Sequence, residues 1–481
     1  MEKGYFLYLY AISLGIVSYL ICLSIGIKFN NLKKFFFEGN SVLKAMSSIV
    51  GSIVSATILL TGLAFGYAMY GFIAVPFFII PGITGLLLFL RKRAIVVMAT
   101  SGEIGSEGAA MEEEDAVVNV FCSPKFCSKP DLYCWLSLLY LFMLAIVEIS
   151  ILKAGAEILF PGDLWAIASV YIIVIIAALY VYVGGFKGVL VTDVVQLILM
   201  AVAASFIISE ISFKGAGNYI INHLIAADFI TTIIAVFGYG IAALTFGGSA
   251  PELWKRVITL KSKKKINCSS WFSAPLVIIA GFFPVLIMIM SDIDPNIVSS
   301  LEDTFIIWKN ILSNNVALFS ASFIILLVTA VFTTIDTQSI TIGQLLRILG
   351  KMNKPLSKML FSSIDVRKWM VLSMIVALAI GVRINLEICM YIGAYAISLT
   401  IPLFILTHIE HKFSLANGLS IPKKAYIIAI VLSLFAIFPV YIFSQSGTPK
   451  LEYIFLGMSM TNLICVGGIA YFRRERKIDE V

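Results

Sequence analysis

The sequence predicts an all-α polytopic membrane protein, and three observations carry that prediction. Hydrophobic residues make up 60% of the 481 residues, the mean hydropathy is +0.99, and only 13% of the residues are charged. Apolar runs of about 20 residues, the length that crosses a bilayer core, recur along the chain. Lys and Arg gather in alternate connecting loops, as they do on the cytoplasmic side of membrane proteins. A soluble globular chain could not cover this much apolar surface.

Each apolar run predicts one transmembrane helix, and together they predict about 13. The predicted spans are 5–27, 43–70, 72–90, 131–158, 163–183, 188–209, 228–250, 269–291, 315–344, 368–386, 388–407, 424–444 and 451–472. Most of the connections between the spans are short, so we expect a single membrane domain.

The distribution of positive charge predicts the orientation of these spans. With the N-terminus outside, the cytoplasmic loops and tail hold 29 of the 35 Lys and Arg residues, and the opposite orientation would reverse the bias. The net charge of +7 therefore reflects topology, and no nucleic-acid partner is expected. We expect a multi-pass protein of the cell (plasma or inner) membrane, surrounded by lipid, with a cytoplasmic C-terminus.

Two spans carry residues that interrupt helices. The second span contains Gly51, Gly62 and Gly66, and the seventh contains Gly238 and Gly240 in the sequence VFGYG, followed by FGGSAP. Interruptions free backbone carbonyls, which is tolerated in a membrane only where they face protein or water. Two such spans, five apart, predict a transporter built from inverted five-helix repeats. Helix packing through small residues is the alternative.

Ionisable residues within spans are candidates for function, because a charge in lipid is costly. Glu148, Lys153 and Glu157 lie in the fourth span, Asp193 in the sixth and Asp336 in the ninth. Lys153 and Glu157 are four residues apart, which predicts a structural ion pair. Asp193 lies near the cytoplasmic end of its span, so an ordinary interfacial carboxylate is the alternative there.

The ninth span contains the most informative polar stretch, TTIDT. Thr333, Thr334, Asp336 and Thr337 supply three hydroxyls and a carboxylate on one short stretch of helix. Hard oxygen ligands of this kind suit sodium or another hard cation rather than zinc. Threonine hydroxyls that bond back to the helix carbonyl four residues earlier are the structural alternative.

Three segments resemble the sodium/solute symporter family, which includes the sodium/proline, sodium/sialic acid and sodium/glucose symporters. They are GGFKGVLVTDVVQ (184–196), SAPELWKRVITLKS (249–262), matched at Pro251 and Arg256, and FTTIDTQSI (332–340). The resemblance covers about 40–410 and implies the leucine-transporter fold, a 5+5 inverted repeat with one extra N-terminal and two extra C-terminal helices. The implied units of the single transporter domain 1–481 are 5–27, the repeats 43–209 and 228–407, and the C-terminal pair 424–472.

The resemblance also implies a sodium site between the second and ninth spans. The segment GLAFGYAMYG (62–71) aligns with a family segment, and counting back from it places two sodium-binding carbonyls on Ser52 and Ser55. On the ninth span the match places a third carbonyl on Ala330 and two hydroxyls on Thr333 and Thr334. Five uncharged oxygens suit a weakly held ion, which must also leave.

A second cation position is implied nearby. In family members that have one, the aspartate of the Thr-Asp signature faces the ninth span, so Asp193 is expected to face Thr333, Asp336 and Thr337. These residues would form a further sodium site or a relay on the exit path. Two carboxylates with no cation between them would repel, and one would tend to take a proton. A proton-coupled step through Asp193 or Asp336 is therefore an alternative.

The expected solute contacts are Val54 and Ile58 in the second span, Glu148 in the fourth, and Phe237 and Tyr239 in the seventh. The apolar pair suits neither a sugar nor a proline-type ligand. Glu148 would be rationalised by a cationic group on the solute or, alternatively, by a salt bridge to the lysine five residues later. The two aromatic residues would form a wall of the site, with core packing as the alternative.

These inferences predict a secondary active transporter rather than an enzyme. Sodium, the transported ion, would move down its gradient and carry a small organic solute inward by alternating access, with no organic cofactor. The alternatives are a proton-coupled transporter of the same fold, a transporter-like membrane sensor and a channel. The identity of the solute and the oligomeric state are left open.

Overall fold

The computed structural model describes residues 3–24, 41–55, 63–72, 74–91, 94–95, 130–210, 229–260, 262–290, 301–314, 317–352, 366–384, 388, 427–428 and 431. Within these residues the secondary structure is helical, joined by short turns. The helices are α1 (Lys3–Ser24), α3 (Val42–Ile53), α4 (Leu63–Tyr70), α5 (Ala74–Thr84), the π-helix η2 (Gly85–Leu90), α8 (Pro130–Leu159), α9 (Leu164–Glu210), α11 (Phe229–Ser249), α12 (Pro251–Ile258), α13 (Lys263–Met290), α14 (Leu301–Asn314), α15 (Ala317–Lys351) and α17 (Val366–Gly381). The all-α prediction is confirmed.

Five helices of the described part are long and apolar enough to cross a bilayer: α1, α8, α9, α13 and α15. They coincide with six of the predicted spans, because α9 contains two. Helix α11 coincides with the seventh span, and α17 with most of the tenth. The spans predicted at 388–407, 424–444 and 451–472 lie almost wholly outside the described residues, so the count of 13 stays a prediction.

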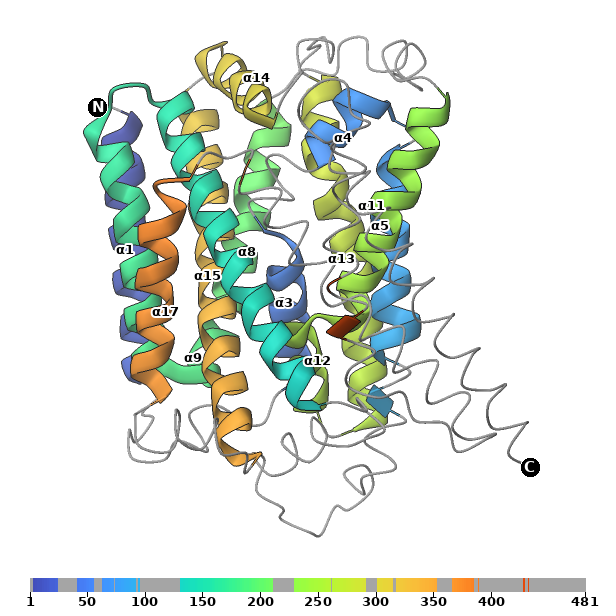
Figure 1. Ribbon diagram of the computed structural model, residues 1–481. Coiled ribbons are helices and arrows are strands. Elements are labelled where there is room, and N and C mark those ends of the chain that lie inside the picture. Colours follow the sequence, from blue (N-terminus) through green and yellow to red (C-terminus); the bar gives the residue numbers. More distant parts are fainter. Residues whose placement is uncertain are drawn as a thin grey trace, which may run out of the picture.

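Helix α9 is two membrane spans that meet at a glycine. Its 47 residues would reach about 70 Å if straight, more than twice a bilayer core. Gly185 interrupts it with φ 57° and ψ −158°, a conformation that only glycine adopts readily. Figure 1 shows the α9 ribbon turning at the lower edge of the bundle. The turn falls in the loop predicted between the fifth and sixth spans.

The second predicted span is interrupted, as expected. Helix α3 ends at Ile53, Val54 has φ −83° and ψ 71°, and Ser55 is also non-helical. The next described helix is α4, which begins at Leu63. The carbonyls of the last turn of α3 therefore lie where the regular helical hydrogen-bond pattern stops.

Of the two interrupting segments predicted for the seventh span, the chain breaks at FGGSAP and not at VFGYG. Helix α11 runs without interruption through Gly238 and Gly240 as far as Ser249. A glycine inside a helix costs only about 1 kcal/mol relative to alanine, and a packed bundle supplies that readily. The chain breaks instead at Ala250, and Pro251 begins α12, because a proline is favoured in the first turn of a helix.

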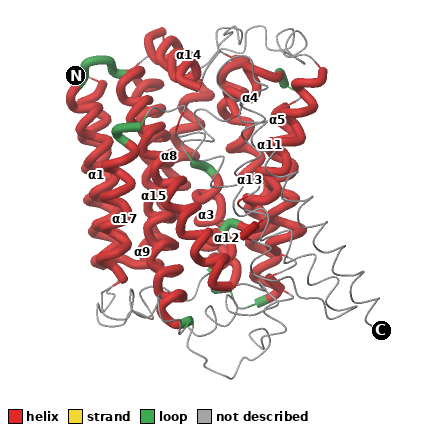
Figure 2. The backbone as a smooth tube through the Cα atoms, in the orientation of Figure 1, coloured by secondary structure: helices red, strands yellow, loops and turns green. Residues whose placement is uncertain are grey.

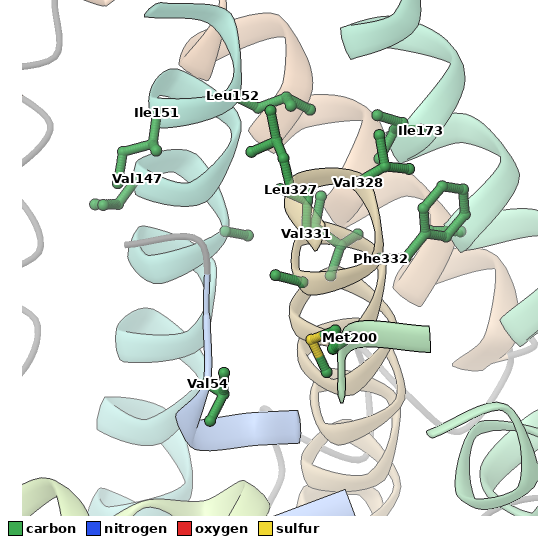
Figure 3. Packing of buried hydrophobic residues seen from close by; sticks show 14 of the residues in the cluster. Val54, Val147, Ile151, Leu152, Ile173, Met200, Leu327, Val328, Val331 and Phe332 are labelled. Atoms are coloured by element: carbon green, nitrogen blue, oxygen red, sulfur yellow. The ribbon is translucent and has the colours of Figure 1, made fainter. Parts of the chain in front are cut away.

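The helices form a single bundle with α3 near its middle (Figures 1 and 2). Helix α15 packs against α8, α9 and α17, α11 packs against α5, and α3 contacts both α9 and α13. In the apolar window of α15 83% of the residues are buried, against 33% for α1, so α15 is a central helix. Figure 3 shows Leu327, Val328, Val331 and Phe332 of α15 among side chains of α8 and α9. This apolar packing holds the polar residues of α15 in fixed positions.

Candidate functional site

The broken end of α3 lies directly against the polar turn of α15. A Cβ atom added to Gly51 would overlap the Cγ2 methyl of Thr333, so the two helices approach as closely as a glycine allows. Ser52 and Ser55, the predicted carbonyl ligands, follow Gly51 by one and four residues, and both are buried. The structure thus brings the end of α3 to the turn of α15 that carries the other predicted ligands.

The α15 ligands form one compact group of oxygens. The Thr334 hydroxyl donates to the Ala330 carbonyl at 2.9 Å, so these two predicted ligands are adjacent. The Thr333 hydroxyl lies 2.8 Å from Gln196 Oε1 and 2.9 Å from the Thr329 carbonyl. Ala330, Thr333 and Thr334 are all buried. The back-bonded geometry considered as the structural alternative is therefore present, and it also orients the hydroxyls.

This donor set fits a monovalent cation. A threonine hydroxyl that gives its single proton to a carbonyl keeps lone pairs on its oxygen for another partner. Carbonyls at an interrupted helix end carry the partial negative charge of the helix terminus. Ser52, Ser55, Ala330, Thr333 and Thr334 would hold sodium through oxygen atoms alone, without a formal charge.

A second group of polar residues surrounds Asp193 of α9. It includes Ser48, which lies about one turn before the end of α3. Ser48 of α3 donates a hydrogen bond to Asp193 Oδ2 and accepts one from Arg256 Nε of α12. Arg256 Nη2 donates to the Thr337 hydroxyl at 2.7 Å and lies 3.9 Å from Asp193 Oδ2. Arg256 and Asp193 are almost completely buried. Four helices, α3, α9, α12 and α15, thus meet at one ion pair.

Asp336 lies next to this pair. Its Oδ2 accepts a hydrogen bond from the Tyr180 hydroxyl of α9, and its carboxylate interacts electrostatically with Asp193 and Arg256. The other oxygens, Asp336 Oδ1 and Asp193 Oδ1, are buried without a hydrogen-bond partner. The structure therefore brings together Asp193, Asp336 and Thr337, the predicted second cation position, and places the Arg256 guanidinium against Asp193 and Thr337.

Comparison with known proteins gives a match in structure but not in sequence. No protein-family model matches the chain, and no curated protein matches its sequence. In structure, the chain is similar to the substrate-bound outward-open state of a Na⁺-coupled sialic acid symporter. The TM-score is 0.66, the identity is 14%, and 96% of each chain is covered. The chain has the fold of a sodium-coupled symporter. This confirms the predicted fold class.

The predicted solute contacts differ in how deeply the structure buries them. Val54 is buried at the end of α3 and belongs to the apolar core, and Glu148 is buried on α8 (Figure 3 labels Val54). Phe237 of α11 is 60% exposed, which rules out core packing as its role. Ile58 and the side chain of Tyr239 lie outside the described residues.

The fourth span also settles a structural prediction. Lys153 Nζ lies 3.5 Å from Glu157 Oε1, so the predicted i, i+4 pair is confirmed. Both side chains are partly exposed, which limits the energy of the pair.

Four residues of the site were not assigned a role from the sequence: Ser48, Tyr180, Gln196 and Arg256. Gln196 and Arg256 were part of recognised segments, but nothing in a linear sequence states which carboxylate an arginine meets. Tyr180 lies four residues before the Gly-Gly turn, and its distance of 156 residues from Asp336 hides the contact. Ser48 looks like an ordinary small helix residue. A search for hydroxyl residues one turn before the interrupted end of α3 would have found it.

Proposed function

We propose that the protein is a sodium-coupled secondary active symporter that imports a small organic solute by alternating access. The observation that carries the proposal is the contact between Gly51 and Thr333, which joins the interrupted end of α3 to the oxygen-rich turn of α15. Sodium bound between them would hold the two helices together. Its release toward the cytoplasm would free α3 to part from α15. We propose the N-terminus outside and the C-terminus in the cytoplasm, from the distribution of Lys and Arg.

For the solute we propose a molecule with an apolar part and a cationic group. Val54 offers an apolar surface where α3 ends, and Glu148 is a buried acid on a helix of the same bundle. Phe237 stays in the proposed set as an aromatic residue of α11 that lies outside the apolar core. Ile58 stays in the proposed set on the resemblance, and Tyr239 on its place beside Gly238 and Gly240 in the seventh span.

The experiment that tests sodium coupling measures thermal stability of the purified full-length protein in sodium chloride and in potassium chloride. A ligand that binds only the folded state at 100 times its Kd stabilises it by about 2.7 kcal/mol. We expect saturable stabilisation by sodium alone. In Thr334→Ala the lost hydroxyl should weaken sodium binding about tenfold or more, which corresponds to about 1.4 kcal/mol.

The matched control is Thr341→Ala. Thr341 lies two turns further along α15, is buried, and makes the same back-bond, to the Thr337 carbonyl at 2.7 Å. The control should lose stability without losing its response to sodium. Equal sodium responses in the parent and Thr334→Ala would refute the proposed site.

Proton coupling is the second candidate, and one observation favours it. Asp193 and Asp336 are two buried carboxylates, and Arg256 forms an ion pair with Asp193, whereas Asp336 accepts a hydrogen bond from Tyr180. Stabilisation that follows pH and ignores sodium, and that disappears in Asp336→Asn, would establish the proton-coupled alternative.

A further inference from the structure

The guanidinium of Arg256 is buried and held in place by hydrogen bonds to residues of three helices. Arg256 is 0% exposed, and each of its three nitrogens donates a hydrogen bond. Nε donates to Ser48 Oγ, Nη1 to the Glu252 carbonyl at 2.6 Å, and Nη2 to Thr337 Oγ1 at 2.7 Å. These acceptors come from α3, α12 and α15, so the guanidinium is fixed by three helices.

The guanidinium contacts two of the residues from which a second cation position is predicted. Its Nη2 donates a hydrogen bond to Thr337 Oγ1 and lies 3.9 Å from Asp193 Oδ2. Both residues belong to the predicted second cation position. Because Thr337 Oγ1 accepts from Nη2, one of its lone pairs already faces a positive charge. The Ser48 hydroxyl donates a further hydrogen bond to the same oxygen, Asp193 Oδ2. An incoming sodium ion would have to share these oxygens with a buried cation.

Charge explains why a cation is needed there at all. Asp193 and Asp336 are both buried, and buried carboxylates near one another repel unless a positive group compensates them. Arg256 forms an ion pair with Asp193, and its charge also acts on Asp336 and on Glu252, a third buried carboxylate on α12. A planar guanidinium suits this place, since it is always charged and can donate to several acceptors at once.

We propose that Arg256 is a resident cation that fills the second cation position, so that the protein binds and carries one sodium ion in each cycle. The proposal rests on the sodium-coupled function above and adds its stoichiometry. It differs from a purely structural ion pair, because removal of the guanidinium must open a position for another sodium ion. The oxygens that would receive that ion are those of Asp193, Asp336, Thr337 and Ser48.

The experiment counts bound ions per protein by equilibrium binding of radioactive sodium (²²Na⁺) to the purified full-length protein. The parent should bind one ion, Asp193→Asn should still bind one, and Thr334→Ala should bind at least tenfold more weakly. Arg256→Gln should bind two ions, and the double variant Arg256→Gln with Asp193→Asn should return to one. Lys255→Gln is the matched control, since it replaces another basic side chain of the same buried helix, where Lys255 Nζ lies over the Phe186 ring. It should bind one.

Each outcome decides between the proposals. Two ions in the parent, with one of them lost in Asp193→Asn, would overturn the role of Arg256 and leave the sodium site intact. One ion in a folded Arg256→Gln variant would also overturn it, in favour of a structural ion pair. If Arg256→Gln does not fold, the count in the parent still tests the stoichiometry: one ion supports the proposal and two ions overturn it. A parent that binds no sodium would refute both this inference and the proposed function.

Discussion

Replacing Gly51 by alanine tests the geometry of the sodium site without removing any ligand. The added methyl group would overlap the Cγ2 atom of Thr333, so α3 and α15 would have to separate by roughly an ångström to reach ordinary van der Waals contact. Thr333 cannot easily turn away, because its hydroxyl lies within bonding distance of Gln196 and Thr329. The strain therefore falls on the distance between the two helices.

The size of the effect follows from the cost of overpacking. An extra methyl group in a packed interior costs about 1–3 kcal/mol. A site tolerates displacements of only about 0.5 Å before its geometry fails. If the sodium-bound arrangement bears the whole cost, sodium affinity falls by about 5-fold to 150-fold. The measurement is sodium affinity from the thermal-shift titration, with potassium held as the complementary salt.

Gly82→Ala provides the control. Gly82 lies in α5, and a Cβ atom there would meet Ala243 at 3.8 Å, which is ordinary contact. Both variants gain the same helix propensity of about 1 kcal/mol, so their difference isolates the contact with Thr333. Gly82→Ala should keep the affinity of the parent. An unchanged sodium affinity in Gly51→Ala would show that α3 and α15 do not form the site together.

Two further substitutions test the surroundings of the site. Tyr180→Phe removes the hydrogen bond to Asp336 while keeping the ring that lies 6.3 Å from Phe332, and it should lower the free energy of unfolding by about 1.5–3 kcal/mol; an unchanged midpoint of thermal unfolding would contradict the contact. Gly185→Ala forces a side chain into φ 57° and ψ −158° at the turn of α9, and it should cost about 1–3 kcal/mol by the same assay. An alanine variant as stable as the parent would mean that this turn does not need a glycine.

Much of the fold could be predicted because its signals are local. Apolar length alone locates α1, α8, α13 and α15, and the Gly-Gly pair locates the turn within α9. The interruption of α3 was predicted from small residues, but the same reasoning failed for α11, which stays helical through Gly238. Glycine permits a break and does not require one, so the outcome depends on the packing that surrounds each helix.

The candidate site was predicted only where ligand types cluster along one helix. Thr333, Thr334, Asp336 and Thr337 are neighbours in sequence, and the stretch was found for that reason. The partners of Asp336 come from α9 and α12, and no pattern in a single sequence states their distance from it. A resemblance supplied Asp193, since it carried the expected facing of a signature residue. The guanidinium among these groups required the tertiary structure.

Both groups of polar residues depend on the same face of α3. Ser48 and Ser52 are one turn apart, and the Ser52 hydroxyl bonds back to the Ser48 carbonyl at 2.6 Å. Ser48 holds Arg256 and Asp193, whereas Ser52 begins the set of proposed sodium ligands. A Cβ atom on Gly51, between them in sequence, would touch Thr333 and lie 3.9 Å from Asp193 Oδ1. A movement of α3 that loosens the sodium ligands must therefore also disturb the ion pair of Arg256. Release of sodium and separation of α12 from α3 are consequently expected as one event, and this links occupancy of the site to the packing on the side of the bundle where α12 lies.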